Sequence, residues 1–180
     1  MELFRHLPNI ITLGRLCLVP LSIVLIASQE WTLAFVVFVC AGLSDALDGW
    51  LAKRFKLETE LGAYLDPLAD KALLVSIYVT LALGHQLPVA LAVLVVSRDV
   101  MIISAVLISF ALGKPVKIKP LFISKLNTTA QIAFAGLILA TKAFDLALGT
   151  GFNLSLAVVA ALTLASAGAY LMQWFRHMAE

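Results

Sequence analysis

The chain has 180 residues, of which 62% are hydrophobic and 13% charged; its formal net charge is +2 and its mean hydropathy is +1.00. This composition is far more apolar than that of soluble globular domains, so it excludes an ordinary soluble enzyme. We therefore expect an integral membrane protein, and we expect no nucleic-acid partner.

Six apolar stretches are each long enough to cross a bilayer, which takes about 20 residues in a helix. They cover residues 9–28, 31–52, 63–83, 88–112, 121–142 and 152–175. The connections between them are short and leave no room for a linker or a soluble domain. The sequence thus predicts an all-α membrane protein with six transmembrane helices, forming one domain over residues 1–180.

The N-terminal segment MELFRHLPN is predicted to form a short interfacial helix that leads into the first span. Its apolar side chains stand beside Arg5 and His6, a mixture typical of helices that lie at a membrane surface. The segment lacks the small-residue cleavage site of a signal peptide, so we expect neither a signal peptide nor a transit peptide here.

The basic residues gather on one side of the predicted spans. Twelve of the thirteen lysines and arginines fall at the N-terminus, at the second and fourth connections with their adjoining helix ends, or at the C-terminus. Only Lys142 lies on the other side. The positive-inside rule therefore predicts that both termini and these two connections face the cytoplasm.

Two aspartates interrupt the second apolar stretch. On a helix, Asp45 and Asp48 lie about 60° apart and share a stripe with Gly49 and Ala52. Because a carboxylate in hydrocarbon costs roughly 2.5 to 3.5 kcal/mol on insertion scales, the pair needs a compensating partner.

The third apolar stretch repeats this arrangement. Gly62, Asp66 and Asp70 follow one another at intervals of four residues and so share one helix face. A short connection joins the second and third stretches as an antiparallel pair, which predicts that four carboxylates converge near the inner membrane surface. Oxygen donors of this kind suit Mg²⁺ or Mn²⁺, and two carboxylate pairs indicate two divalent ions.

Two other interpretations of the aspartates stay open at this point. Each carboxylate can pair with a nearby base, and Lys53, Arg54 and Lys71 are available for that role. An ion-conducting pathway also uses carboxylates inside the membrane, but it does not account for glycine and alanine on the same stripe.

The spacing of these residues resembles a known signature. The pattern D-x-x-D-G-x-x-A-[R/K]-x8-G-x3-D-x3-D of the CDP-alcohol phosphatidyltransferases is matched by Asp45, Asp48, Gly49, Ala52, Lys53, Gly62, Asp66 and Asp70. One departure is visible, because the family usually has arginine where this chain has Lys53, followed by Arg54. Arginine grips a phosphate with two parallel donors and lysine does not.

This resemblance implies a six-helix enzyme of the CDP-alcohol phosphatidyltransferase fold, usually a homodimer, that opens toward the cytoplasm. We expect it in a bacterial cytoplasmic membrane. It implies transfer of a phosphatidyl group from CDP-diacylglycerol to an alcohol, with release of CMP, and dependence on Mg²⁺ or Mn²⁺. The implied metal ligands are Asp45, Asp48, Asp66 and Asp70. Asp70 is also the implied general base on the acceptor hydroxyl. The implied contacts to CDP-diacylglycerol are Asp45, Gly49, Ala52, Lys53, Gly62 and Asp66.

Basic and polar residues outside the signature are candidates for binding the acceptor. Thr12 and Arg15 share a face near the cytoplasmic end of the first stretch, where an arginine can also simply extend to the lipid head groups. Arg98 and Asp99 lie deep enough in the fourth stretch to be costly, which fits either a functional role or a tight ion pair. The expected acceptor-binding residues are Thr12, Arg15, Arg98, Lys119 and Lys125.

Further segments bear on which alcohol is the acceptor. SRDVMI, KPLFISKLNTTAQ and LDPLADKALL resemble the cardiolipin synthases of this family, which join CDP-diacylglycerol to phosphatidylglycerol. The members that make phosphatidylglycerophosphate from glycerol 3-phosphate share the N-x-x-T-x-x-R motif and the signature. We expect cardiolipin synthesis, with phosphatidylglycerophosphate synthesis as the alternative.

Overall fold

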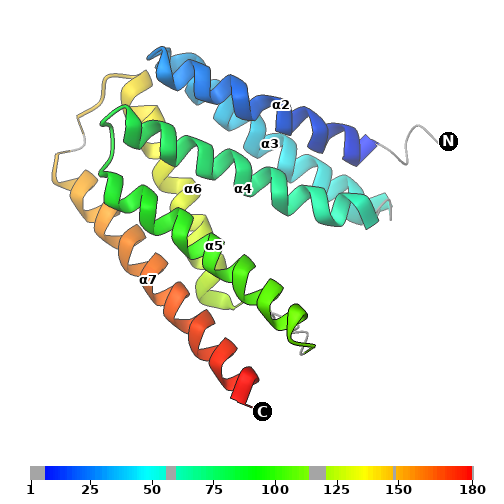
Figure 1. Cartoon of the computed structure of the whole chain (residues 1–180). Coiled ribbons are helices and arrows are strands. Elements are labelled where there is room, and N and C mark those ends of the chain that lie inside the picture. Colours follow the sequence, from blue (N-terminus) through cyan, green and yellow to red (C-terminus); the bar gives the residue numbers. More distant parts are fainter. Residues whose placement is uncertain (1–6, 56–59, 114–120, 148, 180) are drawn as a thin grey trace. The chain divides into compact units, whose positions relative to one another are not determined.

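The structure is a computed structural model that describes residues 7–55, 60–113, 121–147 and 149–179. Side chains are described for residues 11–47, 49, 54, 69–113, 121–147 and 149–178. Within these ranges every regular element is a helix and no strand occurs (Figure 1). The helices are α2 (Leu7–Ala27), α3 (Trp31–Phe55), α4 (Glu60–Leu83), α5 (Val89–Ala111), α6 (Phe122–Ala143) and α7 (Thr150–Ala179). The predicted all-α fold is confirmed.

Hydropathy explains why these segments are helical, since a helix satisfies all backbone polar groups within one segment where no water is present. Three helices of the described chain are long and apolar enough to cross a membrane: Val89–Ala111, Phe122–Ala143 and Thr150–Met178. Shorter apolar segments cover Ile11–Ala27 and Trp31–Leu47. The chain is thus a membrane protein, whereas the full number of six spans stays a prediction.

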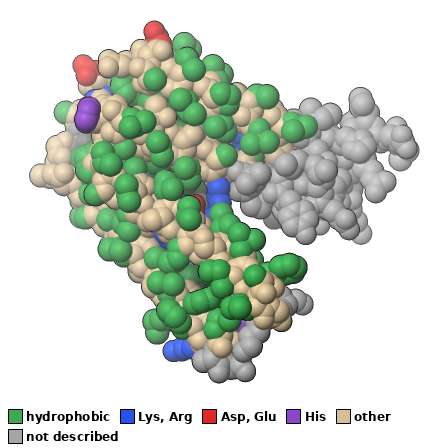
Figure 2. Space-filling model, viewed as in Figure 1, with side chains coloured by type: hydrophobic (Ala, Val, Ile, Leu, Met, Phe, Trp, Pro, Cys, Tyr) green, Lys and Arg blue, Asp and Glu red, His purple; other side chains and the backbone are tan. Residues whose placement is uncertain are grey.

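Large apolar side chains are exposed along the helices, as lipid-facing positions require. Figure 2 shows hydrophobic side chains spread over the visible face of the molecule. Leu107, Phe110 and Leu164 are among the exposed ones. An exposed apolar surface of this extent is typical of a membrane-facing protein.

Three connections are tight turns of the same kind. Gln29, His85 and Asp145 follow the ends of α2, α4 and α6 with positive φ values of 60°, 56° and 52°. In each turn the next residue donates its backbone N–H to the carbonyl five residues before it, at 2.9 Å. These hydrogen bonds satisfy the last carbonyls of each helix, and the turn reverses the direction of the chain within a few residues. This accounts for the short connections.

The chain divides into two compact units. The first contains the described residues of Met1–Gln86 and Ala135–Ala147, and within it α2 packs against both α3 and α4. Ala34 and Ala41 on α3 and Ala69 on α4 are buried, and small side chains of this kind let helices approach closely. Gly136 lies against Phe38, since an added Cβ would come within 3.0 Å of the Phe38 ring.

The second unit contains the described residues of Leu87–Phe134 and Leu148–Glu180, so α6 contributes its first half here. Helix α5 packs against α7. Trp174 Nε1 on α7 donates to Ser109 Oγ on α5 at 2.8 Å and lies 3.1 Å from the Ala105 carbonyl oxygen. Polar contacts of this kind join helices where lipid provides no hydrophobic driving force.

Two predictions about organisation are not tested by these observations. The interfacial helix expected over residues 1–9 falls largely on residues 1–6, which lie outside the described residues. That the whole of residues 1–180 acts as one domain also stays a prediction.

Candidate functional site

The first unit holds a buried arginine between two of the signature aspartates. Arg15 on α2 is 2% exposed, and its Nη1 lies 2.8 Å from Asp45 Oδ1 on α3. The same nitrogen donates to Asp70 Oδ1 on α4. Because α2 packs against both α3 and α4, one side chain on α2 reaches carboxylates on two different helices.

This contact brings Asp45 and Asp70 together. Their Oδ1 atoms share one nitrogen, so the two carboxylates lie side by side although 25 residues separate them in the chain. Both side chains are 46% exposed, which leaves them open to a ligand. The sequence predicted this convergence from the antiparallel pairing of the two helices, but it did not predict Arg15 as the partner.

The other predicted residues of this region are described only in part. Thr12, one turn before Arg15, is fully buried. A Cβ added at Gly49 would meet no described atom within 4 Å, so the helix surface beside Gly49 is open. The backbones of Asp48, Ala52, Lys53, Gly62 and Asp66 belong to α3 and α4, and nothing beyond the backbone is described at these positions.

The donor set of this site fits a hard divalent cation. Asp45 and Asp70 offer carboxylate oxygens from two helices, and Mg²⁺ or Mn²⁺ is bound through one or two carboxylates, waters and substrate phosphates. Among the described side chains no group of three or more His, Cys, Asp or Glu is placed to hold a metal. Asp48 and Asp66 are not among those side chains, so the four-carboxylate site stays a prediction.

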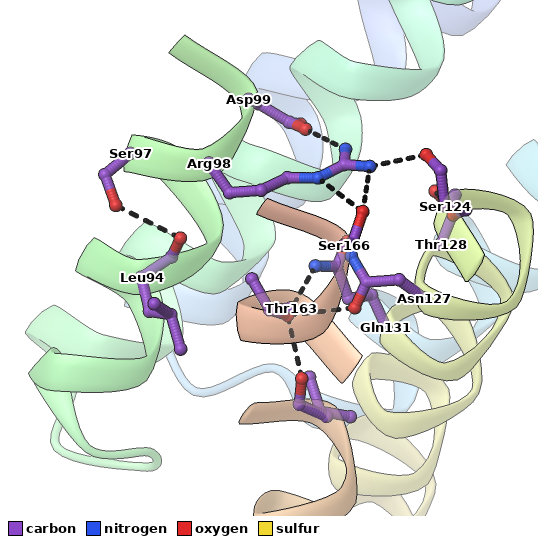
Figure 3. A network of polar contacts seen from close by, with 11 residues as sticks. Leu94, Ser97, Arg98, Asp99, Ser124, Asn127, Thr128, Gln131, Thr163 and Ser166 are labelled. Atoms are coloured by element: carbon purple, nitrogen blue, oxygen red, sulfur yellow. Dashed lines mark hydrogen bonds and ion pairs between the residues drawn. The ribbon is translucent and has the colours of Figure 1, made fainter. Parts of the chain in front are cut away.

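The second unit buries another arginine, but among hydroxyl groups. Arg98 on α5 is 5% exposed; its Nε and Nη2 donate to Ser166 Oγ on α7 at 3.2 and 2.7 Å. Nη2 also donates to Ser124 on α6, and Nη1 pairs with Asp99 Oδ1 at 2.6 Å (Figure 3). The guanidinium carbon lies 5.5 Å from the centre of the Tyr170 ring, within cation–π range.

The polar contacts continue between α6 and α7. Thr163 Oγ1 lies 2.9 Å from Asn127 Oδ1 and 2.7 Å from the Val159 carbonyl oxygen, and Gln131 Nε2 donates to Thr163 Oγ1 at 3.2 Å (Figure 3). Asn127 is fully buried, and its Nδ2 has no hydrogen-bond partner among the described residues. Arg98 is therefore part of a polar cluster that joins three helices.

The predicted acceptor-binding residues are thus separated into different surroundings. Arg15 contacts two signature aspartates, whereas Arg98 contacts Asp99 and two serines, and both sets of contacts lie within single units. Lys125 is exposed on α6, next to the serine that Arg98 contacts. Lys119 lies outside the described residues.

The ion pair of Arg98 with Asp99 is one of the two interpretations that the sequence left open. The polar residues of α6 and α7 in this cluster were missed from the sequence, although a signal was present. Ser124, Asn127 and Gln131 follow at spacings of three and four on α6, and Thr163 and Ser166 are three apart on α7. Such spacings place polar side chains on one face of each helix, and in an apolar span that face needs a polar partner.

These features define a class, a helical membrane protein with paired carboxylates that converge between neighbouring helices. The sequence profile described as CDP-alcohol phosphatidyltransferase matches residues 5–172, and the chain belongs to this family. Members of the family generally depend on a divalent metal and use CDP-alcohols with lipid or glycerol-phosphate acceptors. The resemblance inferred from the signature is confirmed.

Individual relatives carry two different activities. The chain is 34% identical to the rat (Rattus norvegicus) cardiolipin synthase (CMP-forming) over 91% of its own length and 60% of the relative's. It is 29% identical to the CDP-diacylglycerol–glycerol-3-phosphate 3-phosphatidyltransferase of Bacillus subtilis, over 92% of this chain and 93% of that one. The Haemophilus influenzae protein of the same name is 36% identical over 74% and 75% of the two chains.

Proposed function

We propose that this protein transfers the phosphatidyl group of CDP-diacylglycerol to the glycerol hydroxyl of phosphatidylglycerol, which gives cardiolipin and CMP. The observation that carries this proposal is the convergence of Asp45 and Asp70 on one nitrogen between α2, α3 and α4. These are the first and last acidic residues of the family signature, so their convergence supports a metal site shared between α3 and α4.

The aspartates have two roles in this proposal. Asp45, Asp48, Asp66 and Asp70 hold two divalent ions, Mg²⁺ or Mn²⁺. When bound, these ions neutralise the diphosphate and stabilise the negative charge on the departing CMP. Asp70 additionally takes the proton of the acceptor hydroxyl, and its half-exposed side chain supports this role because an acceptor can reach it.

The bond changes are those of a direct displacement. The acceptor oxygen forms a bond to the phosphorus that carries diacylglycerol, and the bond from that phosphorus to the bridging oxygen breaks. CMP leaves with the electron pair, and the hydroxyl proton goes to the Asp70 carboxylate. Positioning and electrostatics therefore supply most of the rate, and no covalent enzyme intermediate is needed.

Small residues beside the aspartates are proposed to receive the nucleotide. Gly49, Ala52 and Gly62 let the cytidine diphosphate approach the helix backbones, while Lys53 contacts a phosphate. The open surface at Gly49 supports this arrangement, since a ligand placed there displaces no described side chain.

The acceptor is proposed to meet the basic residues outside the signature. These residues are Thr12, Arg15, Arg98, Lys119 and Lys125. Lys125 is exposed and so is open to an anionic head group. Arg98 is nearly buried, and its guanidinium contacts two serine hydroxyls. An acceptor phosphate that binds Arg98 therefore replaces these hydroxyls as its hydrogen-bond acceptor.

The same site serves an alternative acceptor. Glycerol 3-phosphate, like phosphatidylglycerol, carries a phosphate beside a free glycerol hydroxyl. Coverage favours this alternative, because a Bacillus subtilis relative named for it is matched over 93% of its length, whereas the rat cardiolipin synthase is matched over 60%. We place cardiolipin synthesis first because the segments SRDVMI, KPLFISKLNTTAQ and LDPLADKALL resemble the cardiolipin synthases. Percentage identity does not separate the two activities, since the rat protein is 34% identical and the two bacterial relatives are 29% and 36% identical.

The proposal also covers the orientation of the enzyme in the membrane and its oligomeric state. We place the active site and both termini on the cytoplasmic side of a bacterial membrane, because twelve of thirteen basic residues lie on that side of the predicted spans. A homodimer is the proposed assembly, as the family resemblance implies.

One experiment tests the reaction and separates the acceptors. The full chain in lipid nanodiscs is incubated with CDP-diacylglycerol and Mn²⁺, with either phosphatidylglycerol or glycerol 3-phosphate, and the products are separated by mass. We expect CMP and cardiolipin with phosphatidylglycerol. If product forms with glycerol 3-phosphate but not with phosphatidylglycerol, the alternative is established. If no CMP is released with either acceptor, the proposed enzyme is rejected.

A further inference from the structure

The position of Arg15 has a consequence for metal binding, if the aspartates hold metal as proposed above. Its Nη1 lies between Asp45 Oδ1 and Asp70 Oδ1 and contacts both. The positively charged guanidinium therefore lies between the two carboxylates, where a metal ion bound by both would also lie. The arginine itself belongs to α2, outside the helices that carry the signature.

Burial makes this arginine a fixed part of the site. Arg15 is 2% exposed, while the two aspartates are 46% exposed. A guanidinium cannot lose its proton in a protein, so a buried one needs an anion beside it. Without a cation, the carboxylates on α3 and α4 would repel one another. The arginine and the two acids therefore stabilise one another in the absence of any metal.

We propose that Arg15 is the resident counter-ion of the metal site, which a divalent cation displaces from Asp45 and Asp70 when it binds. Both cations are drawn to the same carboxylate pair, and two positive charges in contact with the same oxygens repel strongly. Arg15 thus lets α2, α3 and α4 pack before metal arrives, and it lowers the affinity for metal that the carboxylates would otherwise have.

The test measures metal binding without turnover. The full chain in nanodiscs is titrated with Mn²⁺, and the free ion is quantified by its electron paramagnetic resonance signal. We expect Arg15→Gln to bind Mn²⁺ about tenfold more tightly than the wild type, because a positive charge has been removed from contact with the ligands. The matched control is Arg176→Gln, which makes the same charge change at an exposed position on α7 and should leave the Kd unchanged.

Thermal unfolding supplies a second readout. Metal-free Arg15→Gln should unfold at a lower temperature than the wild type, and saturating Mn²⁺ should raise its midpoint more than it raises that of the wild type. If Arg15→Gln folds only when Mn²⁺ is present during purification, that rescue supports the proposal in the same way.

Arg15→Lys keeps the test decisive if the glutamine variant does not fold at all. Lysine retains the charge but is shorter and lacks the planar fork, so we expect it to fold and to bind Mn²⁺ about threefold more tightly than the wild type. Unchanged or weaker Mn²⁺ binding in the variant that folds would overturn the proposal, because Arg15 would then not compete with the metal.

The same titration separates this inference from the proposed function. A wild type that binds Mn²⁺ and releases CMP, together with Arg15 variants of unchanged or higher Kd, rejects only the counter-ion role. A wild type that neither binds Mn²⁺ nor releases CMP rejects both. Tighter binding in the variants supports the counter-ion role, and CMP release by the wild type separately supports the proposed function.

Discussion

The two units of the chain each bury an arginine inside apolar helices, but they neutralise it differently. Arg15 contacts Asp45 and Asp70, whose side chains are 46% exposed. Arg98 contacts two serine hydroxyls and Asp99, whose side chain is 14% exposed. The first arginine has charged and accessible partners, whereas the second has mostly neutral and enclosed ones.

This difference separates a site that is open to ligands from one whose larger role is to hold helices together. Accessible carboxylates can give up one cation for another, since water and ions reach them. Water does not reach the enclosed hydroxyls, so it cannot take the place of a guanidinium that has been removed. Removing the guanidinium therefore takes a hydrogen-bond donor away from buried polar groups. We therefore expect substitutions in the first unit to affect chemistry most and substitutions in the second to affect stability most.

The largest effect should come from Asp70→Asn. This change removes a proposed metal ligand and the proposed base together, so transfer should fall by about a thousandfold or more. Asp145→Asn is a matched control, because Asp145 is exposed and asparagine tolerates its positive φ of 52°. The rate of CMP release measures the activity of both variants. An Asp70→Asn protein with more than a tenth of the wild-type rate would contradict the assignment.

Gly49→Leu should affect the first unit without unfolding it. A leucine here fills the open surface proposed for the nucleotide, so KM for CDP-diacylglycerol should rise about tenfold or more. The unfolding midpoint should stay near that of the wild type, because an added Cβ meets no described atom within 4 Å. Gly168→Leu makes the same change at an open position on α7 and should leave KM unaltered. Equal KM values in the two variants would place the nucleotide elsewhere.

In the second unit, Arg98→Ala should lower stability more than it affects activity. Removing the guanidinium takes a buried donor away from Asp99, Ser124 and Ser166, at a cost of about 3 kcal/mol in the free energy of unfolding. KM for the acceptor should also rise more than KM for CDP-diacylglycerol. Thermal unfolding and initial rates measure the two effects, and a variant as stable as the wild type would remove the structural role inferred from Figure 3.

The presence of the helices could be predicted from the sequence because each contains a long apolar run. All six predicted stretches correspond to helices, with differences at the ends. The third was predicted from residue 63, whereas α4 begins at Glu60, since the charged Glu60 and the two residues after it are helical too. The last was predicted to end at residue 175, and α7 continues to Ala179. Polarity marks where a helix leaves the lipid, and not where it ends.

The site could be predicted only as far as local spacing reaches. Asp45 and Asp70 were expected to converge because each belongs to a helix with a regular acidic face. Arg15 was not expected as their partner, because that contact depends on how α2 packs against α3 and α4. The bases considered from sequence, such as Arg54 and Lys71, were neighbours along the chain instead. Tertiary packing, which spacing does not encode, selects the cation.

The smallest effect tests whether the remaining polar contacts of the second unit bind its helices. Thr163→Val keeps the shape of the side chain and removes the hydroxyl that contacts Asn127 and Gln131, at a cost of about 1 kcal/mol in the free energy of unfolding. Thr128→Val is the matched control, because Thr128 is exposed and its hydroxyl contacts only the Ser124 carbonyl among the described residues. Thermal unfolding should distinguish the two variants. If both are equally stable, the hydroxyl of Thr163 adds nothing to helix association, and the stability of this unit depends on Arg98 and apolar packing.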